Sequence, residues 1–219
     1  MTSLLIATRN AHKTREIQEI LGSDFELRDL TAHPEIPETI ESGKTFEENA
    51  ILKAVAVSRE CSGLVAADDS GLEVDALGGA PGIFSARYAG KDAIDKQNVD
   101  KLLGELARHF SWRTAPSSEV SERQVGNLRN LSARFRCVIA LTRRGRLLET
   151  FKGAVEGRIV DVPRGRQGFG YDPIFVPIGF EETFAELPIE LKNRISHRAQ
   201  AIQKLAQYLT NHFPNNFRG

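Results

Sequence analysis

The stretch LLIATRNAHKTREIQEILG, which spans residues 4–22, indicates the fold class. Its first four residues are apolar, which is typical of a short buried strand, and Thr8-Arg9-Asn10 interrupts that strand. Apolar residues then recur at helical spacing from Ile17 to Leu21, and Gly22 provides a stop signal. A strand, a polar turn and a helix in immediate succession predict an α/β protein.

The composition excludes several classes of protein. The chain has 219 residues, of which 41% are hydrophobic and 26% are charged, as in a globular domain and not in a disordered or collagen-like chain. Lysine and arginine together number 29, as do aspartate and glutamate, so no net positive charge attracts a nucleic-acid polymer or an anionic membrane. Any phosphate group must therefore be bound by a local cluster of cations.

The cysteines and the N-terminus indicate the compartment. Cys61 and Cys137 lack the spacing of a metal site and are too few for a disulfide framework, so we expect free thiols in a reducing environment. The first residues lack the basic start and the long apolar stretch of a secretory signal, and no apolar run approaches the ~20 residues that span a bilayer. These features predict a soluble, cytoplasmic protein.

The rest of the pattern predicts one domain with further strands and helices. Thr45 and Glu48 form a capping-box pattern, which predicts the start of a helix after a polar loop at 31–44. Asn49 and Lys53 lie four residues apart on this helix and therefore point the same way. The other expected elements are a strand at 64–67, an extended segment at 72–77, a helix with an apolar stripe from Val99 to Phe110, a surface insertion or mobile loop at 111–132, a hairpin at 134–156, a glycine-rich loop at 165–173 and a last helix from Ser196.

A first candidate site lies where the opening strand meets its helix. The free backbone N–H groups and the positive end of a helix that begins after Asn10 suit a phosphate group. Thr8 and Asn10 add short polar side chains, and Lys13 adds a positive charge one turn into the helix. The alternative interpretation is an ordinary helix cap with a solvated lysine.

A second candidate site is Asp68-Asp69-Ser70, which directly follows the apolar strand at 64–67. Two adjacent carboxylates repel each other, and strand geometry would point them to opposite faces. Carboxylate oxygens are natural ligands of Mg²⁺, which keeps several waters and contacts substrate phosphates. Glu38 and Glu41, in the preceding loop, are candidates for a second ligand. The alternative interpretation is a solvated Asp-Asp-Ser-Gly turn.

Two further candidates lie near the C-terminus. In the segment from Gly168 to Pro173, glycines permit close approach of the backbone to a flat ligand, and aromatic rings are suited to stack on a base. The alternative there is a tight turn with buried aromatic residues. Lys192 and Ser196-His197-Arg198 place cations near a helix start, where they oppose the helix dipole unless an anion or a carbonyl lies opposite. The alternative for this second segment is a surface cap that faces water.

Together, these clusters combine several cations with an acidic pair in an otherwise neutral chain. Cations that bind phosphates and carboxylates that bind Mg²⁺ are the groups that a nucleotide phosphohydrolase needs. Two other hypotheses remain open. A serine hydrolase would use Ser70, His197 and Asp172, although the chain lacks the G-x-S-x-G elbow. A non-catalytic nucleotide sensor would bind a triphosphate without turnover.

Seven motifs, in order, resemble those of the Ham1-like inosine/xanthosine triphosphate pyrophosphatase family, over nearly the whole chain except 111–132. The motifs are Thr8-x-Asn10-x-x-Lys13, Thr45-Phe46-x-Glu48-Asn49-Ala50, Ala67-Asp68-Asp69-Ser70-Gly71-Leu72, Gly78-Gly79-Ala80-Pro81-Gly82, Ser85-Ala86-Arg87-Tyr88, Gly168-Phe169-Gly170-Tyr171-Asp172-Pro173 and Ser196-His197-Arg198. The resemblance implies an α/β fold of two lobes around a long central mixed sheet, with a nucleotide cleft between them. It also implies a homodimer, a Mg²⁺ requirement and hydrolysis of ITP, dITP or XTP to the monophosphate and pyrophosphate, which cleanses the nucleotide pool.

The resemblance further implies a role for each matching residue. Asp69 would be the general base or metal-bound carboxylate that prepares the attacking water, Glu41 would help to hold Mg²⁺, and Asp68 would support the site. Lys13 and Lys53 would hold the triphosphate. The other implied substrate-binding residues are Thr8, Arg9 and Asn10 for the phosphates, Ser70, Phe169, Gly170, Tyr171 and Asp172 for the nucleoside, and Lys192, His197 and Arg198 for the 6-keto group of the purine. Arg9 stands where the family commonly has glycine, so it either adds a phosphate contact or crowds the loop.

Overall fold

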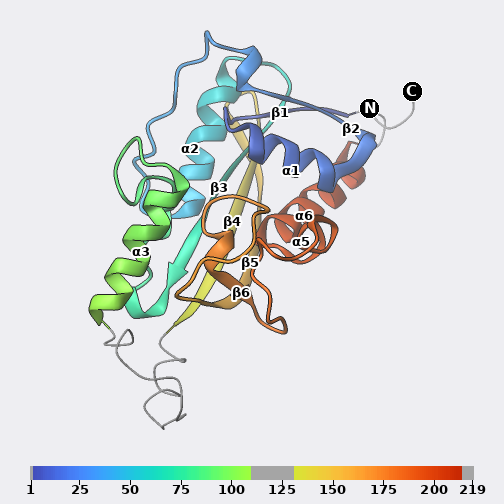
Figure 1. The fold of residues 1–219 in the computed structure, drawn as a ribbon. Helices are drawn as coiled ribbons and strands as arrows, with labels where there is room; N and C mark the ends of the chain where they lie inside the picture. Colours follow the sequence, from blue (N-terminus) through green and yellow to red (C-terminus); the bar gives the residue numbers. More distant parts are fainter. Residues whose placement is uncertain (1, 110–130, 214–219) are drawn as a thin grey trace, which may run out of the picture. The chain divides into compact units, whose positions relative to one another are not determined.

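The computed structural model describes residues 2–109 and 131–213, in which strands alternate with α-helices as far as residue 109 and are followed by three successive strands and two α-helices (Figure 1). The strands of this part of the chain are β1 (Thr2–Ile6), β2 (Phe25–Asp29), β3 (Leu64–Val74), β4 (Ser132–Arg143), β5 (Arg146–Ile159) and β6 (Phe175–Pro177). Its α-helices are α1 (Ala11–Leu21), α2 (Phe46–Arg59), α3 (Asp95–His109), α5 (Ile189–Ile195) and α6 (His197–His212).

The strands form one mixed sheet with the order β2-β1-β3-β4-β5-β6. β1 runs parallel to both β2 and β3, and β5 runs antiparallel to β6. β4 and β5 are joined by Arg144 and Gly145, whose φ angles of 51° and 73° suit a tight two-residue hairpin turn. The predicted α/β class with a mixed sheet is confirmed, whereas a nucleotide cleft between two lobes stays a prediction.

The contacts of the chain form two compact units. Unit 1 comprises Met1–Ser70, Arg136–Ala154 and Asn193–Gly219, and unit 2 comprises Gly71–Phe135 and Val155–Lys192. The residues predicted to handle phosphate and metal belong to unit 1. The loop from Phe169 to Asp172 and the nearby Lys192 belong to unit 2.

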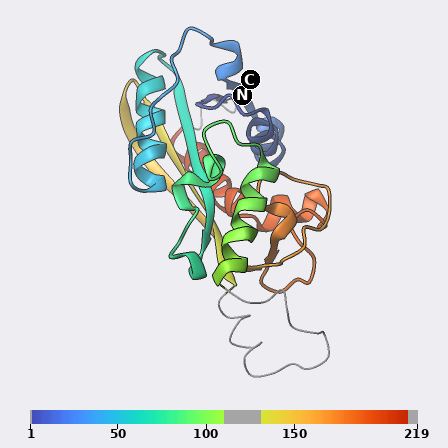
Figure 2. The same cartoon turned by 60° about the vertical axis from the view of Figure 1, so that its left-hand side comes forward.

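In unit 1, helices cover both faces of the sheet. The hydrophobic core cluster joins apolar residues of α1 and α6 to Ile139 and Leu141. These two residues lie two positions apart in β4 and therefore point to the same face of the sheet. The next residue, Thr142, points the other way and donates a 3.0 Å hydrogen bond from Oγ1 to the carbonyl oxygen of Ala54 in α2. Accordingly, α2 lies on the opposite side of these strands from α1 and α6 (Figures 1 and 2).

Unit 2 has an aromatic core. The ring centroids of Phe135 in β4 and Phe175 in β6 lie 4.7 Å apart, and Phe184 packs 5.2 Å from Phe175. Helix α3 buries Leu102 and Leu106, as its predicted apolar stripe requires. The last residue of that stripe, position 110, lies outside the described residues.

The structure differs from the sequence prediction at β3. The strand continues through Val74, so Asp68-Asp69-Ser70 lie inside a strand and the predicted strand end was wrong. The local pattern is misleading here because charged side chains of α1, α2 and α6 contact these polar residues inside the strand. The sequence pattern also did not predict β2, β6 or α5. The predicted insertion at 111–132 lies outside the described residues, apart from Leu131 and Ser132, where β4 begins.

We expect Gly153→Ala to lower the free energy of unfolding by about 1–3 kcal/mol. Gly153 lies in β5, and a Cβ added to it would come within 2.0 Å of the carbonyl oxygen of His197 and 2.9 Å of the backbone nitrogen of Ala201. The start of α6 must therefore move to admit a methyl group. Urea unfolding measures the change, and Gly63→Ala, whose Cβ would meet nothing within 4 Å, is the matched control. An unchanged midpoint for Gly153→Ala would contradict this close packing.

Candidate active site

The acidic residues of β3 lie beyond the end of its neighbour β1. The ladder between these strands ends at Ile6 and Ala66, and the next backbone hydrogen bond joins Ala7 N to Ala66 O at 2.8 Å. Asp68 and Asp69 therefore lie in β3 just beyond the carboxyl end of the parallel strand β1, and open α/β sheets bind ligands outside the carboxyl ends of their strands.

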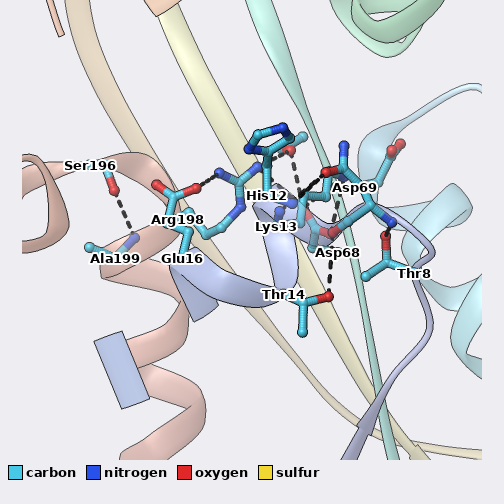
Figure 3. Close-up of polar contacts among 12 residues, drawn as sticks. Thr8, His12, Lys13, Thr14, Glu16, Asp68, Asp69, Ser196, Arg198 and Ala199 are labelled. Carbon is cyan, nitrogen blue, oxygen red and sulfur yellow. Dashed lines mark hydrogen bonds and ion pairs between the residues drawn. The ribbon is translucent and has the colours of Figure 1, made fainter. Parts of the chain in front are cut away.

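The loop after β1 leads directly into α1. Asn10 caps this helix, because its Oδ1 accepts hydrogen bonds from His12 N at 2.9 Å and from Lys13 N at 3.3 Å. Thr8 Oγ1 accepts a bond from Asn10 N at 3.1 Å and stabilises the turn (Figure 3). The helix start predicted after Asn10 is confirmed, and the lysine predicted one turn later contacts Asp68 instead of extending into solvent.

Asp68 is surrounded by cations on one face of β3. Lys13 Nζ lies 3.1 Å from each carboxylate oxygen of Asp68, and Arg198 Nη2 lies 3.5 Å from its Oδ2 (Figure 3). Ser70 Oγ donates to the same Oδ2 at 3.1 Å. Burial by itself raises the pKa of Asp68, but the charges of Lys13 and Arg198 outweigh burial and hold that pKa well below its usual range. Asp68 is therefore an ionised carboxylate that fixes both cations.

Arg198 is anchored by an acidic residue that the sequence reasoning missed. Its Nη1 lies 2.5 Å from Glu16 Oε2, and its Nη2 donates to Ser70 Oγ at 2.8 Å. Burial lowers the pKa of Arg198, but the carboxylates of Glu16 and Asp68 outweigh this and raise it. Glu16 lies three residues after Lys13 on α1 and so shares its helix face, and that spacing is the signal by which it could have been found.

The opposite face of β3 presents Asp69 to α2. Lys53 Nζ lies 3.2 Å from Asp69 Oδ1 and 2.8 Å from Glu41 Oε1. Burial lowers the pKa of Lys53, but the surrounding carboxylates outweigh burial and raise it. Thr45 caps α2 as predicted and thereby fixes the helix turn from which Lys53 emerges. These contacts confirm that the two adjacent carboxylates point to opposite faces of the strand.

Asp69 differs from Asp68 in its electrostatic environment. Its Oδ2 atom is buried and has no hydrogen-bond partner among the described residues. Burial raises the pKa of Asp69 above its usual value, and although Lys53 opposes this, Glu41 adds to it. A carboxylate whose pKa is raised accepts a proton more readily, which suits a general base.

The charged network formed by these groups fits a divalent cation. It contains three cations and four carboxylates, which are Lys13, Lys53, Arg198, Glu16, Glu41, Asp68 and Asp69. A bound polyphosphate would add negative charge, which Mg²⁺ can neutralise, and the unpartnered Asp69 Oδ2 is a suitable ligand atom. Across residues 2–109 and 131–213, no three or more His, Cys, Asp or Glu residues are grouped as a metal site. Two carboxylates suffice for Mg²⁺ when phosphates complete its coordination.

The guanidinium group of Arg9 contacts the loop that carries Glu41. Its Nη2 donates to the carbonyl oxygen of Ile36 at 2.6 Å and to that of His33 at 3.3 Å. The predicted loop at 31–44 is irregular, apart from a short 3₁₀ turn at its start. Contact between Arg9 and a substrate phosphate stays a prediction.

Unit 2 contains the second set of predicted site residues. Lys192 Nζ lies 2.6 Å from Asp172 Oδ2, and both residues are buried. The same oxygen accepts a hydrogen bond from Phe169 N at 2.8 Å. The ammonium group also lies 5.1 Å from the centroid of the half-buried Phe169 ring, within the range of a cation–π contact. Asp172 therefore holds the lysine and the aromatic residue together.

The glycine-rich loop is shaped by backbone requirements. Gly168 has a φ of 74°, and a Cβ there would come within 2.0 Å of Asp172 Oδ2, so glycine is required. Gly170 N donates at 2.7 Å to a carboxylate at the start of α3. Tyr171 is buried, and its hydroxyl donates to Ser85 O at 2.9 Å. The Tyr171 ring thus packs inside unit 2, and its stacking on a base stays a prediction.

The last predicted segment forms the start of α6. Ser196 caps the helix, with its Oγ accepting a bond from Ala199 N at 3.1 Å (Figure 3). His197 and Arg198 have exposed fractions of only 4% and 2%. The predicted helix start is confirmed, and the alternative of a surface cap that faces water is wrong.

These features define an α/β protein with a charged network beside β3, just beyond the carboxyl end of the parallel strand β1. Its sequence matches the Ham1 family over residues 4–208. It is 46% identical over 213 residues to a dITP/XTP pyrophosphatase of Bacillus licheniformis, covering 95% of this chain and 98% of the relative. It is 48% identical over 211 residues to a dITP/XTP pyrophosphatase of Geobacter sulfurreducens, covering 95% and 97%.

Solved structures agree with this match. A HAM1 protein from Coxiella burnetii has a TM-score of 0.79 and 39% sequence identity, covering 96% of this chain and all of that one (100%). The chain belongs to the Ham1 family. In residues 2–109 and 131–213, the helices are too short or too polar to cross a membrane.

Proposed function

We propose that this protein is a Mg²⁺-dependent nucleoside triphosphate pyrophosphatase, which hydrolyses dITP, ITP and XTP to the monophosphate and pyrophosphate. The contact of Lys53 with both Glu41 and Asp69 carries the proposal, because it gathers two metal-type ligands and a phosphate-type cation at one point. The relatives named dITP/XTP pyrophosphatase support the choice of reaction and substrates. The activity removes deaminated purine nucleotides from the nucleotide pool.

The triphosphate is bound mainly by groups of unit 1. Lys13 and Lys53 contact the phosphates, together with the backbone N–H groups that Thr8 and Asn10 arrange at the start of α1. Glu41 and Asp69 hold Mg²⁺, which when bound neutralises phosphate charge and makes a coordinated water more acidic. Removing either lysine therefore weakens substrate binding and charge stabilisation together.

Asp69, a carboxylate beside Lys53, accepts a proton from the attacking water. The water oxygen forms a bond to the α-phosphorus, and the bond from that phosphorus to the bridging oxygen breaks. Pyrophosphate leaves with the bonding electron pair. Lys13 and Lys53 stabilise the negative charge that develops, and Asp68 holds Lys13 in place at 3.1 Å.

Lys192, His197 and Arg198 read the purine in this proposal. Donors directed at the 6-keto oxygen pair with hypoxanthine and xanthine, whereas the 6-amino group of adenine is itself a donor and would meet these protein donors without an acceptor between them. Phe169 is suited to stack on the base, because its ring is half-buried beside Lys192. Asp172 contributes to recognition of the purine because its Oδ2 atom holds Lys192 Nζ in place at 2.6 Å.

A panel of nucleoside triphosphates tests the proposal. With Mg²⁺ present, we expect dITP, ITP and XTP to release pyrophosphate at least about 100-fold faster than dATP and ATP, because the 6-amino donor of adenine would face protein donors where the 6-keto oxygen accepts their hydrogen bonds. Pyrophosphate and orthophosphate are measured in parallel, and chelation of Mg²⁺ is the control. Orthophosphate as the sole product would overturn the reaction, and saturable binding of dITP without turnover would favour a nucleotide sensor.

The contacts of Ser70 do not favour a serine hydrolase. Its hydroxyl donates to Asp68 Oδ2 and accepts a bond from Arg198 Nη2. The hydroxyl group thus donates its proton in a hydrogen bond to a carboxylate and not to an imidazole base. The negative charge of that carboxylate also disfavours the oxyanion that forms when a serine attacks a carbonyl group. In the proposed function, Ser70 contacts the nucleoside instead.

The protein is further proposed to act as a homodimer in the cytoplasm. Both cysteines are free thiols, and burial raises the pKa of Cys137 to about 12, which keeps that thiol protonated and suits a reducing compartment. The homodimer is proposed from the resemblance of the sequence motifs. Light scattering of the purified chain measures its mass, and cell fractionation measures its location.

A further inference from the structure

Arg9 joins two segments that are distant in the sequence. It follows β1, and its Nη2 atom donates to the carbonyl oxygens of Ile36 and His33, which lie 27 and 24 residues further along the chain. The Ile36 bond is short, at 2.6 Å. A planar guanidinium that donates to two carbonyls restrains both of them with less loss of side-chain freedom than a flexible ammonium would.

The segment that Arg9 contacts leads to Glu41. Residues 37–42, here termed the acidic loop, have no regular secondary structure. Before this loop, the Ile36 side chain is buried, and after it Gly43 N donates to Asn49 Oδ1 at 2.9 Å. Between these two anchored points, Ile40 is 83% exposed. Glu41 is the residue of the acidic loop that contacts Lys53, at 2.8 Å.

We propose that Arg9 is a positioning residue that holds the acidic loop so that Glu41 reaches Lys53 and the metal ion, and that it is not a ligand of the substrate phosphates. The inference rests on the proposed function where it assigns a metal ion to Glu41. Without the Arg9 bonds, one anchor of the loop is lost and the loop visits more conformations. Only the fraction with Glu41 beside Lys53 binds the metal, so apparent metal affinity falls in proportion to that fraction.

Hydrogen exchange tests the restraint without metal or nucleotide. Arg9→Met keeps an unbranched, flexible side chain and removes its donors, so we expect the hydrogen-bonded amides of Ile36, Ser42 and Gly43, which lie in or beside the acidic loop, to exchange at least about tenfold faster. The matched control is Arg15→Met, which removes an equal charge from an exposed arginine of α1 that makes no hydrogen bond or ion pair with the described residues. Unchanged exchange in Arg9→Met would overturn the restraint.

A double-mutant cycle with Glu41→Gln tests whether Arg9 acts through Glu41. Mn²⁺ binding is measured by electron paramagnetic resonance without nucleotide, and the Mg²⁺ dependence of dITP turnover is measured separately. We expect Arg9→Met to weaken apparent metal affinity about tenfold and to leave the KM for dITP at saturating Mg²⁺ unchanged. In the Glu41→Gln background, Arg9→Met should cause no further loss.

Two outcomes of the cycle would overturn the positioning role. An increased KM for dITP at saturating Mg²⁺ would indicate that Arg9 contacts the phosphates directly. Losses of metal affinity that add in the double variant would show that Arg9 does not act through Glu41. Failure of the proposed function is distinguishable from both. If the wild type does not turn over dITP, the pyrophosphatase proposal fails, while hydrogen exchange and Mn²⁺ binding still decide the role of Arg9.

Discussion

Asp69→Asn is expected to lower the kcat for dITP by about 10³-fold, while the Kd of the nucleotide stays within about threefold of the wild-type value. Asparagine keeps the size of the side chain and one oxygen for Lys53, which lies 3.2 Å from Asp69 Oδ1. It cannot accept a proton from water, and a neutral amide is a weaker metal ligand. The loss should therefore fall on the chemical step and not on binding.

Pyrophosphate release under saturating dITP and Mg²⁺ measures the effect of this substitution. The matched control is Asp161→Asn, which removes one carboxylate from an exposed position. Isothermal titration calorimetry with dITP separates binding from turnover. A near-normal kcat for Asp69→Asn would refute the assignment of Asp69 as the general base.

The same variant is expected to be more stable than the wild type at neutral pH. Burial, reinforced by Glu41, raises the pKa of Asp69 in the native state above its ordinary value of 3.8, which the unfolded state keeps. Between pH 3.8 and the higher pKa of the native state, the native state therefore binds more protons than the unfolded state. Wild-type stability therefore falls as the pH rises through that window and stays lower above it. Asparagine does not titrate, so the advantage of the variant vanishes below pH 3.8. Urea unfolding at several pH values measures this difference.

Arg198→Met is expected to lower the free energy of unfolding by about 3–5 kcal/mol, because removal of one partner leaves buried carboxylates uncompensated. Glu16 and Asp68 have exposed fractions of 7% and 4%, and both contact the Arg198 guanidinium. A loss of this size is a large part of the ~5–15 kcal/mol that stabilises a typical domain. This prediction gives Arg198 a structural role in unit 1 in addition to its proposed contact with the purine.

Urea unfolding tests the role of Arg198, with the m-value as a check that the extent of unfolding is unchanged. Lys204→Met, on the exposed side of α6, is the control and should stay within about 0.5 kcal/mol of the wild type. Adding Glu16→Met to Arg198→Met should recover part of the loss, because it removes one of the uncompensated charges. A loss below about 1 kcal/mol in Arg198→Met would show that the guanidinium does not stabilise these carboxylates.

Several features could be predicted because local signals determine them. The opening strand, the Asn10 turn and α1 follow from a periodicity that lies within one short segment. The starts of α2 and α6 follow from Thr45 and Ser196, whose hydroxyl oxygens accept backbone N–H groups three residues later. The motif resemblance identified the family for the same reason, since motifs are runs of neighbouring residues.

Features that depend on residues far apart in the chain could not be predicted in this way. The local sequence around Asp68 is typical of a turn. In the structure, Lys13 and Arg198, which are 55 and 130 residues away, bind the Asp68 carboxylate, and the strand continues past it. Glu16 has no motif of its own and acquires a role only through Arg198.

The sequence by itself determined the α/β class, the family and the helix starts, and it supplied the charged residues that are proposed to carry the chemistry. Only the tertiary structure decided which carboxylate contacts which cation, that one Asp69 oxygen has no hydrogen-bond partner in the described part of the chain, and that the Arg9 guanidinium reaches the loop of Glu41. The physical reason is the separation along the chain over which each interaction acts. Periodicity and capping act over a few residues, whereas an ion pair or the burial of a charge depends on whatever the fold brings within a few ångströms.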